Sequence, residues 1–258
     1  MICLQKALFF DCAYGISGDM TLGALLSLGV DFDLLCSELK KVDFGGYELQ
    51  CTQVNRYGVP AKKLNVVLKP DATDNQYEKN PYDVLNLIKS SSLSTAMKRD
   101  AEKTVNILVQ AQAKAHRIPI QSVHFHEKGA VDTLVDVIGT AIGFSLLKIQ
   151  NVYFTPLFDG NGFIQCRCGR IPVPVPATRE IVKRFRIPTR TRPIESELVT
   201  PTGAAIVAAN CTEFRDCMPN SAVLIKTGAG AGDYDYGEGG YLKCSMYNVP
   251  SFRETANH

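Results

Sequence analysis

The sequence has little of several features that assign a protein to a class at once. Its 258 residues contain no apolar run long enough to cross a membrane, so no membrane span is expected. Lysine and arginine number 28 against 26 acidic residues, and this net charge of +2 gives no bulk attraction to nucleic acid. The first residues lack a basic stretch followed by a long apolar core, which argues against a signal peptide. We therefore expect a cytoplasmic protein without a membrane or nucleic-acid partner.

Paired cysteines and common catalytic motifs are also missing. The nine cysteines are odd in number and irregularly spaced, unlike the disulfide framework of a short secreted domain. The close pair Cys166 and Cys168 would share one face of a strand, where it could bind metal or simply be structural. No Walker P-loop, GxGxxG, nucleophile elbow or HExxH motif is present. The chemistry must therefore come from a less common arrangement of residues.

Hydrophobic patterning predicts helices and strands that do not alternate strictly, which is typical of an α+β fold with helices packed on a mixed sheet. The expected helices cover residues 20–28, 32–40, 82–89, 95–116, 129–147 and 177–184, and another begins after Thr200. The expected strands cover residues 6–12, 47–54, 63–68, 152–158, 163–168 and 223–229.

Turn residues suggest how these elements are connected. Residues 159–162 predict a hairpin turn between the strands on either side, and a short strand should end at residue 125. Residues 228–240 contain too much glycine to suggest packing, so they are expected to form a loop. We thus expect a main domain over residues 1–227. Residues 228–258 should add the loop, an edge strand at 241–247 and a flexible tail.

Two of the four histidines lie within a segment rich in metal-binding residue types. In an extended segment, His124 and His126 would point the same way, and Glu127 follows directly. Asp132 and Asp136 are four residues apart, which places both carboxylates on one face of an otherwise apolar helix. Imidazole and carboxylate suit divalent ions such as Zn, Ni, Mn or Fe(II). A hydrogen-bonded strand and a solvated helix face are the alternative.

The pH dependence of metal binding should distinguish these ligand types. Imidazoles titrate near pH 6.5 and ordinary carboxylates near pH 4. Protons should therefore compete with the metal between pH 7 and 5 only if the histidines are ligands.

Two loops that open helices could bind an anion through backbone N–H groups. One follows a buried strand that ends in a carboxylate, and the other begins with a Thr-Pro helix start. Simple helix capping explains both equally well, or better in the second case. The candidate substrate- or phosphate-binding residues are Asp11, Ser17, Gly18, Asp19, Thr200, Thr202 and Gly203.

Four blocks occur in order between Phe10 and Ile206: FDCAYGISGDMTLGALLSLGV, VHFHEKGAVDTLVDVIGTA, GRIPVPVPAT and ELVTPTGAAI. Together they resemble the LarC family of nickel-insertion proteins. The resemblance implies a lyase-type nickel chelatase that places nickel into pyridinium-3,5-bisthiocarboxylic acid mononucleotide, the cofactor precursor of lactate racemase and related enzymes. It also implies dependence on CTP with Mg or Mn, and we expect a homo-oligomer.

The sequence departs from the family pattern at several points. Residues 70–81 lack the histidine-rich stretch of many members, and Cys168 stands where members usually have histidine. Cys168 is therefore a candidate extra metal ligand. Members continue into a C-terminal nucleotide-binding domain, so this chain resembles their N-terminal part and could need such a domain as a separately encoded partner. A non-catalytic nickel metallochaperone, or a metal-dependent hydrolase with Glu127 as base, are the alternative functions.

Overall fold

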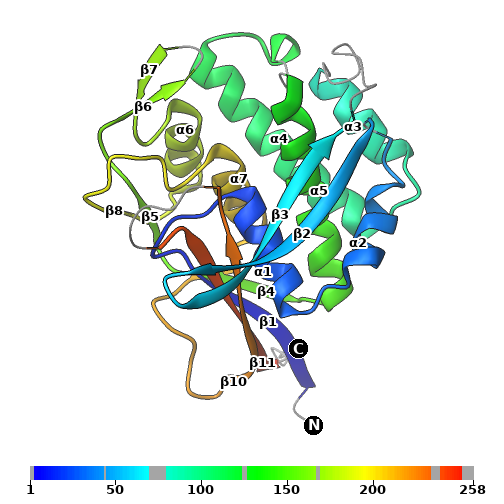
Figure 1. The fold of residues 1–258 in the computed structure, drawn as a ribbon, viewed down its shortest axis with the longest axis vertical. Coiled ribbons are helices and arrows are strands. Elements are labelled where there is room, and N and C mark those ends of the chain that lie inside the picture. The colour runs from blue at the N-terminus through cyan, green and yellow to red at the C-terminus, as the bar shows by residue number, and fades with distance from the viewer. Residues whose placement is uncertain are drawn as a thin grey trace, which may run out of the picture.

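A mixed β-sheet of seven strands organises the chain (Figure 1). The computed structural model describes residues 3–43, 45–69, 80–123, 127–166, 169–233 and 239–251, and the side chains of residues 3, 127–130, 166 and 251 lie outside that description. The strands of the large sheet are β1 (Cys3–Asp11), β2 (Tyr47–Arg56), β3 (Val59–Leu68), β4 (Asn151–Phe154), β9 (Glu213–Phe214), β10 (Val223–Ala231) and β11 (Tyr241–Ser251). Their spatial order is β2-β3-β10-β11-β1-β4-β9.

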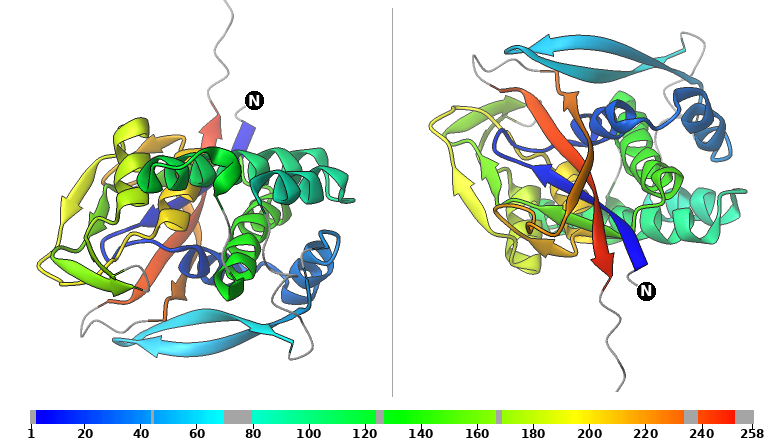
Figure 2. Two further views of the ribbon diagram at one scale, coloured as in Figure 1. Left: turned by 90° about the horizontal axis from the view of Figure 1, so that it is seen from above. Right: turned by 90° about the horizontal axis from the view of Figure 1, so that it is seen from below.

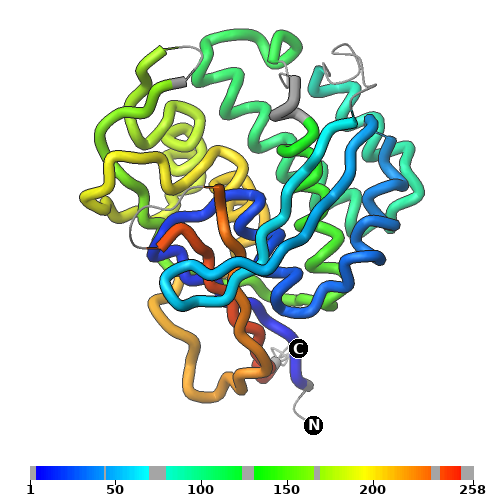
Figure 3. Tube along the Cα trace, in the orientation of Figure 1, coloured from blue at the N-terminus to red at the C-terminus, as the bar shows by residue number. Residues whose placement is uncertain are grey.

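Strand directions within this sheet are mixed. β1 pairs antiparallel with β11 and parallel with β4, while β10 pairs antiparallel with β11 and parallel with β3. Cys3 is opposite Ser251, so the two ends of the described chain lie side by side (Figure 3). The expected α+β fold with a mixed sheet is confirmed.

Helices pack on the sheet and on one another. They are α1 (Gly18–Leu28), α2 (Phe32–Leu39), α3 (Pro81–Ser90), α4 (Thr95–His116), α5 (Glu127–Leu147), α6 (Pro176–Phe185) and α7 (Pro201–Asn210). Figure 2 shows α1 between the β2–β3 hairpin and α5, and α5 in turn packs against α4. Among the described residues, no helix combines the length and apolar character that crossing a membrane requires.

Glycines of β10 let helix α1 approach the sheet more closely than side chains would allow. A Cβ on Gly230 would lie 1.9 Å from the Met20 carbonyl oxygen, and one on Gly228 would lie 2.8 Å from Ser27 Cβ. The prediction of a glycine-rich loop from residue 228 is therefore wrong for residues 228–231, which are a buried part of β10. The glycines are needed for close packing against α1, and the expected boundary after residue 227 falls inside this strand.

The expected edge strand near the C-terminal end is an inner strand. β11 runs between β10 and β1 and hydrogen-bonds to both. Its pairing partner β1 is nearly the full chain away in sequence, and such long-range pairing leaves no local sequence signal.

Small residues also bring α1 and α5 together. A Cβ on Gly139 would lie 2.8 Å from Leu22 Cδ2, and one on Gly143 would lie 2.9 Å from Leu25 Cδ1. Because residues 136, 139 and 143 share one face of α5, this contact also aims Asp136 at the start of α1.

The predicted hairpin around residues 159–162 is wrong. β5 (Leu157–Asp159) pairs in parallel with β8 (Thr189–Thr191), whereas β6 (Phe163–Cys166) pairs antiparallel with β7 (Gly169–Pro172). Residues 160–162 do separate β5 from β6. The side chain of Asp159, however, accepts hydrogen bonds from Leu198 N and Val199 N, which lie much later in the chain.

The connector before α5 also differs from expectation. Residues 120–122 form the 3₁₀ helix η2 (Ile120–Ser122), and α5 begins at Glu127, two residues earlier than predicted. Residues 124–126, where the short strand was expected to end, lie outside the described residues.

Candidate functional site

The N-terminus of α1 forms one wall of the site. Ser17 caps the helix by accepting a hydrogen bond from Met20 N at 3.4 Å, and its hydroxyl also donates to Asp19 Oδ1. The preceding loop is fixed by bonds from Ile16 N to Leu198 O and from Thr200 N to Ile16 O. The starts of α1 and α7 are therefore held side by side.

Asp136 of α5 lies against the first residue of α1. A Cβ on Gly18 would lie 2.3 Å from Asp136 Oδ2, so only glycine leaves room for this carboxylate. Asp132 lies one helical turn earlier on the same face of α5. The structure thus gathers three sequence-predicted candidates, Asp19, Asp132 and Asp136, from two helices.

The pKa values of these aspartates show how closely they interact. Burial raises the pKa of Asp136 well above its usual range, and repulsion from Asp19 and Asp132 adds to the effect. Desolvation, then repulsion from Asp233 and Asp19, raises the pKa of Asp132 to about 6, although its side chain keeps contact with solvent. Burial also raises the pKa of Asp19, despite its bond from Ser17. Ionised together, these groups repel one another, and a bound cation would relieve that repulsion.

Asp233 completes this group, which we call the aspartate cluster (Asp19, Asp132, Asp136 and Asp233). It follows β10, acts electrostatically on the other three, and forms an ion pair with Lys63 at 2.8 Å. Asp233 is not among the candidates from the sequence, because the glycine content of residues 228–240 predicts a loop. The alternation of glycine before it, GAGAG, is the signal of close strand–helix packing that could have identified it.

A pocket of about 460 Å³ opens beside the cluster. Its lining includes Ser17, Asp19 and Asp233 from the cluster side, and Glu197 and Thr200 from the segment that leads into α7. The pocket is thus large enough for a small molecule and acidic on the side where the cluster lies.

The remaining candidate anion-binding residues have structural duties. Thr200 Oγ1 accepts from Gly203 N at 3.1 Å, and a Cβ on Gly203 would lie 2.2 Å from Ile16 O. Asp11 Oδ1 accepts from Ala13 N at 3.1 Å, and Asp11 is not among the described lining residues of the pocket. Thr202 lies in the first turn of α7. The capping interpretation of these loops therefore accounts for Thr200 and Gly203.

The predicted nitrogen and sulfur ligands cannot be placed. His124, His126 and Cys168 lie outside the described residues, as do the side chains of Glu127 and Cys166. Within the part of the chain that the structure describes, no three histidine, cysteine or acidic side chains are arranged to hold a metal ion by themselves. Glu127 begins α5, so the histidine segment joins the helix that carries Asp132 and Asp136.

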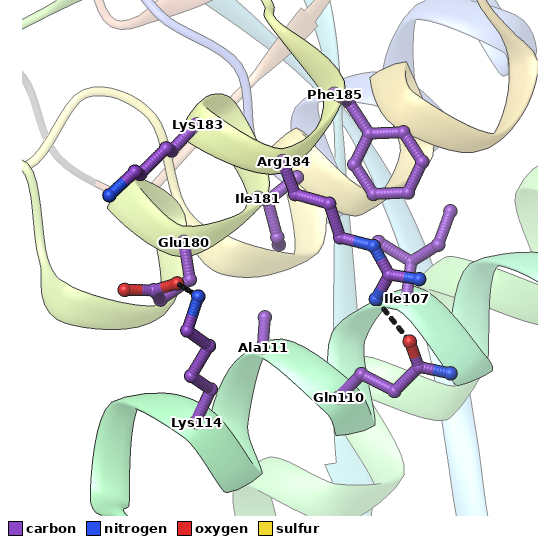
Figure 4. A pocket seen from close by; sticks show the side chains of 9 residues that line it. All are labelled: Ile107, Gln110, Ala111, Lys114, Glu180, Ile181, Lys183, Arg184 and Phe185. Atoms are coloured by element: carbon purple, nitrogen blue, oxygen red, sulfur yellow. Dashed lines mark hydrogen bonds and ion pairs between the residues drawn. The ribbon is translucent and has the colours of Figure 1, made fainter.

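A second groove, of about 430 Å³, lies between α4 and α6 (Figure 4). Its lining carries one carboxylate, Glu180, which forms an ion pair with Lys114 at 2.6 Å, while Arg184 donates to Gln110. Cationic side chains dominate this groove, so it does not suit a metal cation.

The fold and site together define a class: an α+β protein in which acidic side chains converge beside a pocket large enough for a small molecule. The family model described as nickel insertion protein matches residues 8–257. The chain belongs to the nickel insertion protein family.

Relatives support this assignment. The chain is 38% identical over 250 residues to the pyridinium-3,5-bisthiocarboxylic acid mononucleotide nickel insertion protein of Acetivibrio thermocellus, covering 95% of this chain and 61% of that protein. It is 37% identical over 254 residues to the protein of the same name from Alkaliphilus metalliredigens, covering 93% and 60%. The chain therefore spans about three fifths of these relatives' length. No solved structure matches it.

Proposed function

We propose that this chain binds nickel and inserts it into pyridinium-3,5-bisthiocarboxylic acid mononucleotide, the compound for which its relatives are named. The observation that carries the proposal is the convergence of four aspartates from three parts of the chain beside one pocket. Lys63 is the described cation that pairs with this cluster, and one positive charge does not balance four carboxylates. A bound divalent cation would raise the positive charge at the cluster to three and so relieve most of the repulsion.

Nickel enters as a substrate and leaves by exchange of ligands. Oxygen from the aspartate cluster, with His124, His126 and Glu127 at the start of α5, would hold Ni(II) loosely. The sulfur atoms of the two thiocarboxylates would then displace these ligands, because soft sulfur binds nickel more strongly than carboxylate oxygen does. Cys168 remains a proposed additional ligand.

The phosphate of the mononucleotide needs donors away from the aspartates. Asp19 belongs with the metal ligands in this proposal, and its charge would repel a phosphate. Ser17, Gly18 and Thr200 remain the proposed phosphate side, since Ser17 and Thr200 line the pocket at two helix starts. Asp11, Thr202 and Gly203 support this side indirectly, through the loops that carry it.

Finer parts of the proposal derive from the resemblance to the family. They are a lyase-type chelatase reaction in the cytoplasm, CTP with Mg or Mn, maturation of lactate racemase-type enzymes, and a homo-oligomer. A separately encoded C-terminal domain is proposed as a partner on the same resemblance.

The test combines metal content with transfer. Chain purified after growth with nickel should carry about one nickel ion by mass spectrometry, beside a metal-free control. With the substrate and Mg–CTP, nickel should move to the small molecule. The proposal would be refuted if chain purified after growth with nickel contains none, and if the chain binds neither nickel nor the substrate when these are added.

A nickel metallochaperone is the second candidate, because an aspartate cluster that binds nickel does not by itself require transfer to a small molecule. It predicts nickel binding without transfer. Adding the remaining domain separately should then restore transfer, whereas transfer by the chain alone would exclude this candidate. Hydrolysis of simple phosphoesters with Zn or Mn would instead support the hydrolase alternative.

A further inference from the structure

A second carboxyl pair, Asp159 and Glu197, lies outside the aspartate cluster, and Glu197 is the member of this pair that lines the same pocket. Asp159 is only 4% exposed, and its Oδ1 accepts hydrogen bonds from the backbone N–H groups of Gly160, Leu198 and Val199 at 2.8, 2.9 and 3.1 Å. These bonds fix the segment that carries Glu197 to the end of β5. Glu197 lines the pocket together with Ser17 and Asp19.

Anchoring the backbone explains the role of Asp159 Oδ1, but not that of Asp159 Oδ2 or of the Glu197 carboxylate. Asp159 Oδ2 is buried and has no hydrogen-bond partner among the described residues, and Glu197 Oε1 is also shut off from solvent. Burial first, and then the charge of Asp159, raises the pKa of Glu197 to about 7. A glutamate that only filled space would not be placed beside a buried carboxylate. The arrangement instead suits a group that gains and loses a proton near neutral pH.

The proposed reaction releases such a proton. The thiocarboxylic acids named for the relatives' substrate stand at ring positions 3 and 5, on either side of carbon 4. A nickel ion bound by both sulfur atoms is held against the C4–H bond. If nickel then bonds to C4, the C–H electron pair becomes the nickel–carbon bond, nickel stays Ni(II), and one proton must leave.

We propose that Glu197 is the base that accepts this proton, with Asp159 as its positioning residue. This inference rests on the proposed function and adds a residue to it. The Glu197 carboxylate becomes a carboxylic acid, and no oxidant or further reactant is required. The aspartates of the cluster are less suited, because the departing nickel occupies them. Glu195 also lines the pocket, but its side chain is exposed, whereas that of Glu197 is partly buried.

The test follows the ring hydrogen with protein loaded with nickel and substrate carrying deuterium at C4. Wild-type protein should insert nickel more slowly into this substrate than into the ordinary one, and the ring should lose its deuterium. Glu197→Gln keeps the shape but cannot accept a proton. It should lower the insertion rate by about 100-fold or more, while calorimetry shows unchanged binding of nickel and substrate. Glu197→Asp should recover part of the rate.

The matched control is Glu213→Gln, a change of the same kind at an exposed glutamate of β9 that does not line the pocket. It should behave like the wild type. Loss of the label at the wild-type rate in Glu197→Gln would overturn the proposal, as would wild-type protein that inserts nickel and keeps the label. Failure of the proposed function is distinguishable, because wild-type protein would then insert no nickel into the substrate, whether or not it binds nickel.

Discussion

The carboxylate of Asp136 fills the space where a side chain on Gly18 would stand, since a Cβ there would lie 2.3 Å from Asp136 Oδ2. The first residue of α1 and an aspartate in α5 therefore depend on each other. Two helices far apart in sequence meet at this point, and the same contact brings Asp19 close to Asp136.

Gly18→Ala should destabilise the protein. Alanine would favour the helix by about 0.5–1 kcal/mol at an unhindered site, but overlap with a buried carboxylate typically costs roughly 1–3 kcal/mol. The overlap should dominate, and nickel affinity should fall because Asp136 must move. Urea unfolding and calorimetry measure the two effects. Gly46→Ala is the control, because its nearest described contact is a Lys69 side-chain atom at 3.5 Å. Equal stability of the two variants would contradict this account.

Asp136→Asn should separate stability from nickel binding. Removing a negative charge from the aspartate cluster should stabilise the metal-free protein at pH 8, because burial and the neighbouring aspartates raise the pKa of Asp136 and so oppose its ionised form. The same change should weaken nickel binding at least tenfold. Thermal unfolding with EDTA and with nickel checks both, beside Asp216→Asn at an exposed position. A variant that is less stable without metal would show that Asp136 is satisfied by other contacts.

The sequence predicted helices better than it predicted sheet partners. Local signals were sufficient for α4, whose bounds match, and for α7, where Thr200 caps and Pro201 opens the helix. β5 was joined to β6 because a turn sequence lies between them, yet β5 pairs with β8, about 30 residues later. Strand pairing depends on tertiary contacts that leave little local trace.

Only part of the candidate site could be predicted, because some of its residues also meet through tertiary contacts. The spacing of Asp132 and Asp136 placed both on one helix face, which needs only helical geometry. Asp233 could not be found this way, because its approach depends on the packing of β10 against α1. The sequence also does not show which carboxylates are buried, so it predicts that they titrate near pH 4. Burial instead raises the pKa of Asp132 to about 6.

The raised pKa of Asp132 changes what the pH dependence of nickel binding can show. Affinity should fall between pH 7 and 5 through both imidazole and carboxylate ligands. The double substitution His124→Ala and His126→Ala should weaken binding at pH 7 and leave a shallower decline, instead of a flat profile. Calorimetry at pH 7, 6 and 5 measures this, with His116→Ala at the exposed end of α4 as control. An unchanged profile in the double variant would exclude the histidines as ligands.

Cys168 offers a separate test of the ligand set. If its thiolate binds nickel, Cys168→Ser should weaken binding, while Cys168→His should preserve it because imidazole also suits nickel. Cys217→Ser, at an exposed free cysteine, is the matched control. Affinities equal to that of the wild type in both Cys168 variants would assign this residue a structural role.

Glu197 should make the stability of the protein depend on pH in a direction opposite to that of most carboxylates. Its pKa is about 7 in the folded protein, against an ordinary value of 4.5, chiefly because of burial and also because of Asp159. Between these values the folded state holds more protons than the unfolded state, so the free energy of unfolding falls as pH rises from about 4.5 to 7 and levels off above.

Glutamine does not titrate. Glu197→Gln should therefore match the wild type near pH 4.5 and exceed its stability at pH 8 by up to about 3 kcal/mol. Other groups titrate in both proteins and cancel in the difference. Urea unfolding at several pH values measures this gap. A gap that stays constant from pH 4.5 to 8 would mean that folding does not shift the pKa of Glu197, and would contradict the coupling of Glu197 to burial and to Asp159.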